Sequence, residues 1–148
     1  MSKTLILGLG NTLLRDDGVG VRVAEKLQAE DLKAEVRNGA TLGLSLFEIL
    51  TKCEKALVVD AVDMGKAPGT MACFSAQEIL ALPESKNFSL HEIGLLEVLK
   101  IGQTLNEEFR NVTIIGIQPQ DLRQGESLSP EVEKVIPQVI EMIKKEVN

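Results

Sequence analysis

Hydrophobic residues recur along the chain with two spacings, and this alternation predicts strands and helices in turn. Continuous apolar runs at residues 3–9, 55–62 and 111–117 are typical of strands that are buried on both faces of a parallel sheet. Residues 34–38 and 70–76 are predicted as two further strands. Because the strand at 70–76 follows a short connection, we expect it to run antiparallel to its predecessor.

Apolar residues spaced three or four positions apart predict helices between and after these strands. Two of the helices have clear start signals. Ser89 and Glu92 have the spacing of a capping box, and Ser129 is a capping serine followed by Pro130 at the first helical position. The predicted helices cover residues 18–30, 42–50, 77–82, 89–102 and the segment from 130 onward.

Strands that alternate with helices predict a single domain, over residues 1–148, in which a sheet lies between two layers of helices. We expect an α/β fold, a three-layer α/β/α sandwich with a twisted, mostly parallel five-stranded mixed sheet. Folds of this class bind ligands in the crevice at the carboxyl ends of their strands. Candidate functional residues are therefore those that follow a strand.

The composition argues against several classes of protein. The chain of 148 residues has a net charge of −6, no Trp or Tyr and no cluster of Lys and Arg, which disfavours nucleic-acid binding. It has no apolar run of about 18 residues and no signal-peptide features, so we expect a cytoplasmic protein without membrane contact. Cys53 and Cys73 lack the spacing of a metal or disulfide site and are expected to be small buried hydrophobic residues.

A glycine-rich turn after the first strand invites comparison with nucleotide-binding loops. The dinucleotide fingerprint requires a third glycine where Leu13 stands and an acidic residue where Asn38 ends the second strand. The lysine of a phosphate-binding loop is also missing. A nucleotide- or flavin-binding module is therefore a less favoured alternative.

The same turn ends in two acidic residues, Asp16 and Asp17, directly before a helix. Either of them could cap that helix, because aspartate is favoured at a helix N-terminus. One aspartate satisfies the capping role, which leaves the other for metal ligation. On residue type alone, capping is the more common role.

Asp60 and His91 occupy comparable places in the predicted fold. Asp60 ends an apolar strand, where a carboxylate is costly unless it is paired, binds a metal or closes the strand as an Asx turn. His91 is the only histidine, and the first turn of a helix disfavours its protonation and keeps it available as a ligand. Taken alone, such a histidine is more often an ordinary surface residue.

The expected proximity of these residues favours a metal site over the separate role that each could have alone. Right-handed crossovers bring the ends of parallel strands to one edge of the sheet, where Asp17, Asp60 and His91 are expected to meet. Two carboxylates and one imidazole leave coordination positions open, as a functional metal site requires. The set contains no thiolate, so it does not favour copper(I) or iron–sulfur chemistry.

Four segments together resemble the NiFe-hydrogenase maturation proteases. They are GLGNTLLRDDGVG at 8–20, VVDAVDMGKAPGT at 58–70, SLHEIGLLEVL at 89–99 and GIQP at 116–119. The resemblance extends over nearly the whole chain and implies a twisted, phosphorylase/hydrolase-like sheet between helices. It also implies a nickel-dependent endopeptidase that removes a C-terminal extension from the nickel-loaded precursor of a NiFe-hydrogenase large subunit. That precursor would be the partner and would carry the nickel.

The resemblance also implies which residues form the site. The metal ligands would be Asp17, Asp60 and His91, with Asp17 standing where some relatives have the longer Glu. Relatives often have Asp-Gly where this chain has Asn38-Gly39, so no role of that carboxylate is carried over. Other divalent metals could occupy such a site in vitro.

The expected chemistry is metal-assisted hydrolysis, because the single histidine is already a ligand and no Ser-His or Cys-His pair is left. Nickel would polarise the scissile carbonyl, activate a water or position the substrate tail, and the sequence leaves these open. Asp16 is a candidate base beside Asp17, Asp60 and His91. A non-catalytic, nickel-sensing assembly chaperone on the same fold is the main alternative. In either role the protein is expected to be a monomer.

Overall fold

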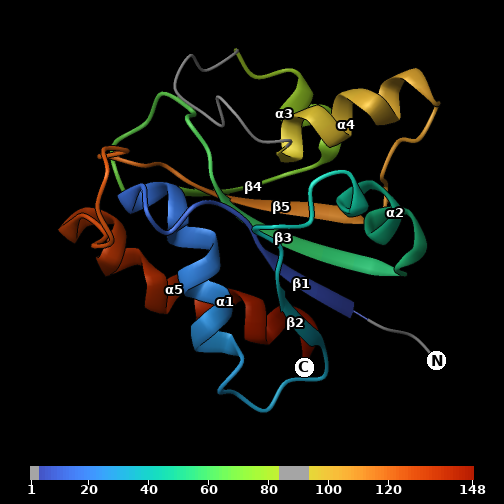
Figure 1. Ribbon diagram of the computed structural model, residues 1–148. Helices are drawn as coiled ribbons and strands as arrows, with labels where there is room; N and C mark the ends of the chain where they lie inside the picture. Colours follow the sequence, from blue (N-terminus) through green and yellow to red (C-terminus); the bar gives the residue numbers. More distant parts are fainter. Residues whose placement is uncertain (1–3, 84–93) are drawn as a thin grey trace.

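The computed structural model describes residues 4–83 and 94–148. Strands and helices alternate along the described chain (Figure 1). In order, the elements are β1 (Thr4–Gly8), the 3-10 helix η1 (Arg15–Gly18), α1 (Val19–Leu27), β2 (Glu35–Asn38), α2 (Ser45–Lys52), β3 (Lys55–Ala61), β4 (Met71–Phe74), α3 (Ala76–Leu80), α4 (Leu95–Thr104), β5 (Val112–Ile117) and α5 (Pro130–Val147).

The five strands form one sheet in the order β2-β1-β3-β5-β4. All neighbouring pairs are parallel except β4 and β5, which are antiparallel. The expected mixed, mostly parallel sheet is therefore confirmed. The chain passes from β1 outward to β2 and then returns to β3 on the other side of β1. The sheet order thus reverses between β1 and β3, which is where ligands bind in folds of this class.

Helices cover both faces of the sheet, which gives the expected three layers. Figure 1 shows α1 and α5 on one side of the sheet, and α3 and α4 on the other. The buried side chains divide in the same way. One apolar cluster joins the sheet to α1 and α5, and the second joins it to α2, α3 and α4. Both faces of the central strands are therefore buried, which explains their continuous apolar sequences.

Close contact between α1 and the sheet depends on Gly20. A Cβ atom built on this residue would overlap the backbone carbonyl oxygens of Val59 in β3 and of Leu9 after β1. The backbone of α1 therefore lies against the ends of the two central strands. This contact fixes where the turn between β1 and α1 lies relative to the end of β3.

Two details of the elements differ from the sequence predictions. α4 begins at Leu95, where the Glu97 carboxylate accepts the N–H of Gly94 (2.8 Å); the start predicted from Ser89 and Glu92 falls on residues outside those described. Cys73 is exposed rather than buried, because it lies on β4 at the edge of the sheet.

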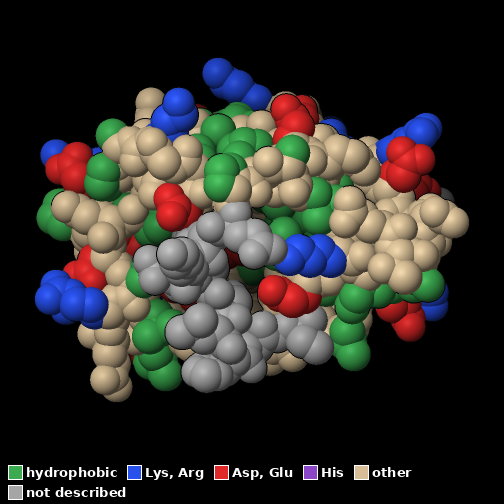
Figure 2. Space-filling view, turned by 90° about the horizontal axis from the view of Figure 1, so that it is seen from above, with side chains coloured by type: hydrophobic (Ala, Val, Ile, Leu, Met, Phe, Trp, Pro, Cys, Tyr) green, Lys and Arg blue, Asp and Glu red, His purple; other side chains and the backbone are tan. Residues whose placement is uncertain are grey.

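Surface charges are mixed on the face seen from above. Figure 2 shows Lys and Arg side chains scattered singly on this face, with acidic side chains between them. Within residues 4–83 and 94–148, no helix is long and apolar enough to cross a membrane.

We expect Gly20→Ala to lower the free energy of unfolding by about 3 kcal/mol, because the added methyl group would force α1 away from the sheet. Gly43→Ala is the control. Its Cβ position is open, and only its positive φ of 54° opposes a side chain, so a loss of about 1 kcal/mol is expected there. Urea denaturation measures both losses. Equal losses would contradict the close packing of α1.

Candidate functional site

The candidate site lies where the sheet order reverses. β1 and β3 are parallel neighbours, with Gly8 opposite Val59, so the turn after β1 and the end of β3 share one edge of the sheet. Asp17 lies in the 3-10 helix η1 after β1, and Asp60 is the penultimate residue of β3. The predicted juxtaposition of these two residues is thus built into the topology.

Asp17 contributes to the folding of its own turn. Its Oδ2 accepts the N–H of Asn11 (2.9 Å), so the carboxylate lies against the loop that leaves β1. No side chain caps α1, and the capping interpretation of Asp17 is therefore wrong. The same hydrogen bond occupies a backbone N–H of the glycine-rich turn with the carboxylate of Asp17. In a loop that binds phosphate, such N–H groups point at the ligand instead. This arrangement therefore disfavours the alternative that the turn binds a nucleotide.

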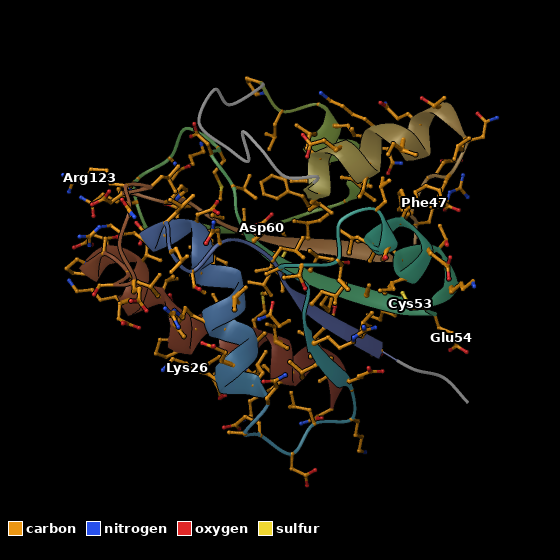
Figure 3. All side chains as sticks on the ribbon, in the orientation of Figure 1. Lys26, Phe47, Cys53, Glu54, Asp60 and Arg123 are labelled. Carbon is orange, nitrogen blue, oxygen red and sulfur yellow. The ribbon has the colours of Figure 1, made fainter. Side chains whose placement is uncertain are left out.

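Asp60 lies half-buried at the carboxyl end of β3 (Figure 3). Burial raises the pKa of its carboxyl group well above the usual range, and the negative charge of Asp17 raises it further. A hydrogen bond from the N–H of Ala61 to Oδ1 (2.9 Å) opposes these effects only in part. Two carboxylates that disfavour each other's ionisation are suited to share a cation, which would relieve the repulsion.

Asp16 has a different environment from its neighbour. It is fully buried, and its carboxylate accepts four hydrogen bonds from the segment that connects β5 to α5. The N–H groups of Gln120 and Asp121 each donate to Oδ2 at 2.9 Å. The N–H of Ser129 donates to Oδ1 (2.8 Å), and its hydroxyl donates to Oδ2 (2.7 Å). These contacts favour a structural role for Asp16 rather than that of a base.

Ser129 is the N-cap residue of α5, as predicted, but its side chain does not cap the helix. The hydroxyl group instead contacts Asp16, which lies 113 positions earlier in the chain. A buried carboxylate at this helix end is also favoured by the helix dipole. Asp16 and Ser129 therefore join the turn that carries Asp17 to the start of the last helix.

Gln118 holds the loop that follows β3, on the Asp60 side of the site. This buried residue follows β5, and its Oε1 accepts the N–H groups of Met64 (2.8 Å) and Lys66 (3.2 Å) in the loop after β3. Its side-chain amide donates to Oδ1 of Asp63 (3.1 Å). The sequence analysis used this residue only as part of the GIQP segment. A polar residue directly after a buried apolar strand was the signal available for its role.

His91 lies outside the described residues, so its predicted place beside the two aspartates stays a prediction. Within the part of the chain that the structure describes, no three His, Cys, Asp or Glu side chains group closely enough to hold a metal ion. Asp17 and Asp60 thus supply two candidate ligands there. A third must come from elsewhere in the chain or from a bound partner.

Comparison with known proteins gives consistent matches. A family model described as hydrogenase maturation protease matches residues 21–146, which include Asp60 and His91. The chain is 37% identical over 142 residues to the hydrogenase expression/formation protein HupD of Thiocapsa roseopersicina, with 93% of this chain and 64% of that protein covered. It thus spans slightly less than two thirds of that relative's length.

Two further matches come from Escherichia coli. The hydrogenase 2 maturation protease of strain K12 is 32% identical over 145 residues, covering 95% of this chain and 88% of that protein. The solved structure of the hydrogenase maturating endopeptidase HybD superposes with a TM-score of 0.78 at 29% identity. That superposition covers 95% of this chain and 89% of the other.

We expect Asp60→Asn to raise the free energy of unfolding of the metal-free protein at pH 7 by about 1 kcal/mol. Because the pKa of Asp60 is raised on folding, the wild-type protein loses stability as pH rises from the unfolded value of about 3.9 through the folded value. The asparagine does not titrate, so its advantage should vanish below about pH 4.

Urea denaturation across this pH range measures the effect of Asp60→Asn. Asp63→Asn is a matched control in the following loop, where the carboxylate is exposed and no such gain is expected. A variant of Asp60 that is less stable than wild type at neutral pH would contradict the burial of an unfavourable charge.

Asp16→Ala should lower the free energy of unfolding by about 4 kcal/mol, because it leaves four partly buried hydrogen-bond donors without this acceptor. Ser129→Ala removes one of the four hydrogen bonds and should cost only about 1 kcal/mol. Hydrogen exchange gives a local measurement. The amides of Gln120 and Asp121 should exchange faster in Asp16→Ala than in Ser129→Ala. Similar exchange in the two variants would show that Asp16 does not hold this segment.

Proposed function

Because this chain belongs to the hydrogenase maturation protease family, we propose that it is a nickel-dependent endopeptidase. Its substrate is the nickel-loaded precursor of a NiFe-hydrogenase large subunit, from which it removes the C-terminal extension. The protein acts in the cytoplasm, as a monomer, before the hydrogenase is complete.

One observation carries this proposal. The carboxylates of Asp17 and Asp60 lie close enough that the charge of the first raises the pKa of the second, and both lie at the carboxyl edge of the sheet. Such a pair is unfavourable in isolation and favourable around a divalent cation. Its place, where the sheet order reverses, is the usual location of a ligand site in this class of fold.

His91 completes the proposed ligand set. Its neutral imidazole suits nickel better than a third carboxylate would, because nitrogen donors bind late first-row metals more strongly than oxygen donors. Three protein ligands leave open positions in the coordination shell of a nickel ion. Thiolates of the precursor would fill these positions in the bound complex.

This arrangement makes recognition depend on metal that is already inserted. Affinity alone would not select nickel, since copper binds more tightly at a site of this kind and zinc also competes. Selectivity follows from the metal that the precursor carries and from the geometry of its ligands. A nickel ion held there would supply Lewis acidity at the scissile peptide or position the tail of the precursor.

Asp16 acts in this proposal as a positioning residue. Its four hydrogen bonds engage both carboxylate oxygens with groups of the 120–129 segment, and its side chain is fully buried. A base must reach the proton that it removes, which such a group cannot do without breaking those contacts. Asp16 therefore holds Asp17 in place and does not take part in the chemistry.

The test is mass spectrometry of the precursor after incubation with the protein. Nickel-loaded precursor should lose its extension, and nickel-free precursor should remain intact. Asp17→Ala, Asp60→Ala and His91→Ala should each reduce cleavage by at least about a hundredfold while the fold is retained, because each removes one ligand. Asp31→Ala is the control, because Asp31 is an exposed carboxylate between α1 and β2, at the opposite edge of the sheet.

Three outcomes would contradict the proposal. Near wild-type cleavage by all three alanine variants would exclude this ligand set. Binding of the nickel-loaded precursor without any cleavage would instead indicate an assembly chaperone. Efficient cleavage of nickel-free precursor would show that the metal is not part of recognition.

A further inference from the structure

A hollow of about 610 Å³ lies beside the turn that carries Asp17. It is bounded by Arg15 and by residues 120–123 and 128–130. Its volume falls within the range of about 300–1,000 Å³ that is usual for ligand pockets. Arg15 is only two positions from Asp17 and directly precedes Asp16, so the hollow and the candidate site share one rigid turn.

The backbone of Arg15 has an unfavourable conformation. Its φ of 47° lies in the left-handed region, which residues other than glycine rarely adopt. The N–H of Arg15 donates to the carbonyl oxygen of Gly125 (2.8 Å), and the next residue is held by the contacts of Asp16. Surrounding structure thus maintains a strained arginine, and residues of this kind cluster at functional sites.

The guanidinium group of Arg15 packs against Gly125. A Cβ atom on Gly125 would lie 2.9 Å from Nε and 3.1 Å from Cζ of Arg15, and the positive φ of 146° at Gly125 also favours glycine there. Nε is buried and has no hydrogen-bond partner among the described residues. Its ion-pair contact, to Oδ2 of Asp121, is 3.6 Å long, beyond the range of a hydrogen bond.

Asp121 is already bound to another cation. Its carboxylate accepts the N–H of Arg123 (3.0 Å) and that residue's Nε (3.0 Å) and Nη2 (2.8 Å). These contacts hold the pKa of Asp121 well below its usual range. The lining of the hollow therefore contains two guanidinium groups and the carboxylate of Asp121, which is hydrogen-bonded to Arg123 and lies 3.6 Å from Nε of Arg15. Nε of Arg15 has no hydrogen-bond partner among the described residues, and the Arg15 side chain is 35% exposed.

We propose that this hollow is a subsite for a carboxylate of the polypeptide that the enzyme processes, and that Arg15 anchors it. The inference rests on the proposed function. A planar guanidinium group binds a carboxylate through two parallel hydrogen bonds, and a preorganised one loses little entropy in doing so. Because the chain has a net charge of −6, an acidic segment of a substrate needs a local cation in order to dock.

The test compares the kinetics of cleavage of the nickel-loaded precursor. Arg15→Gln should raise KM about tenfold and leave kcat within about twofold, since one charge-assisted contact is lost away from the scissile bond. Arg15→Lys keeps the charge without the planar fork and should be intermediate. Arg110→Gln, which changes an exposed arginine at the opposite edge of the sheet, should have no effect.

Arg15→Gly separates binding from folding. Glycine adopts positive φ without strain, so this variant should unfold no more easily than wild type although its KM rises. Replacing the matching Asp or Glu of the precursor by its amide should raise the KM of wild type to the same extent. That replacement should have no further effect in Arg15→Gly, because the two changes remove one interaction. Unchanged KM in Arg15→Gly, or additive effects, would overturn the proposal.

A second measurement does not depend on cleavage. Calorimetric titration of peptides from the precursor extension, with acidic residues or with their amides, should show tighter binding of the acidic form to wild type only. This difference would persist even if the protein cut nothing, so failure of the proposed function is distinguishable. If inorganic phosphate binds in an Arg15-dependent way while the amide replacements have no effect, the hollow is an inorganic-anion site and the proposal is overturned.

Discussion

The buried carboxylate of Asp16 is the contact on which the rest of the site depends. One side chain accepts hydrogen bonds from three residues of a segment that follows the last strand. Burying a carboxylate in this way is favourable only when its lone pairs are satisfied, as they are here. The contact converts two surface loops into one rigid unit. The contacts of Asp16 therefore fix the positions of its sequence neighbours, Arg15 and Asp17.

A second brace acts on the other side of the site. Gln118, at the end of β5, holds the loop after β3 through its side-chain amide, and the residues that follow it contact Asp16. The segment after β5 therefore contacts both loops that flank the candidate ligands. Its polar groups hold these loops in place although the negative charge of Asp17 disfavours the ionisation of Asp60.

The elements of the fold follow closely from local sequence signals. Buried apolar runs identify the central strands, and Pro130 marks the first residue of α5. The position of Asp60 also follows from the sequence, since a strand end and the crossover rule suffice to place it. Contacts between distant segments do not follow in this way. In the sequence, Asp16 and Ser129 both have the residue type and position of a helix cap. In the structure, Ser129 instead donates hydrogen bonds to the Asp16 carboxylate, 113 positions away in the chain. Their residue types fit both roles, and only the fold decides between them.

The same long-range contacts have a consequence for the order of folding. Gln120 and Ser129 lie 104 and 113 positions after Asp16, so the turn that carries Asp17 takes its final shape only when the segment between β5 and α5 has docked. Contacts of large sequence separation form late, because a long loop must close first. A nascent chain that ends before Gln120 contains both aspartates of the site but none of the four hydrogen bonds that Asp16 accepts. The candidate site is thereby kept unformed through most of the synthesis of the chain.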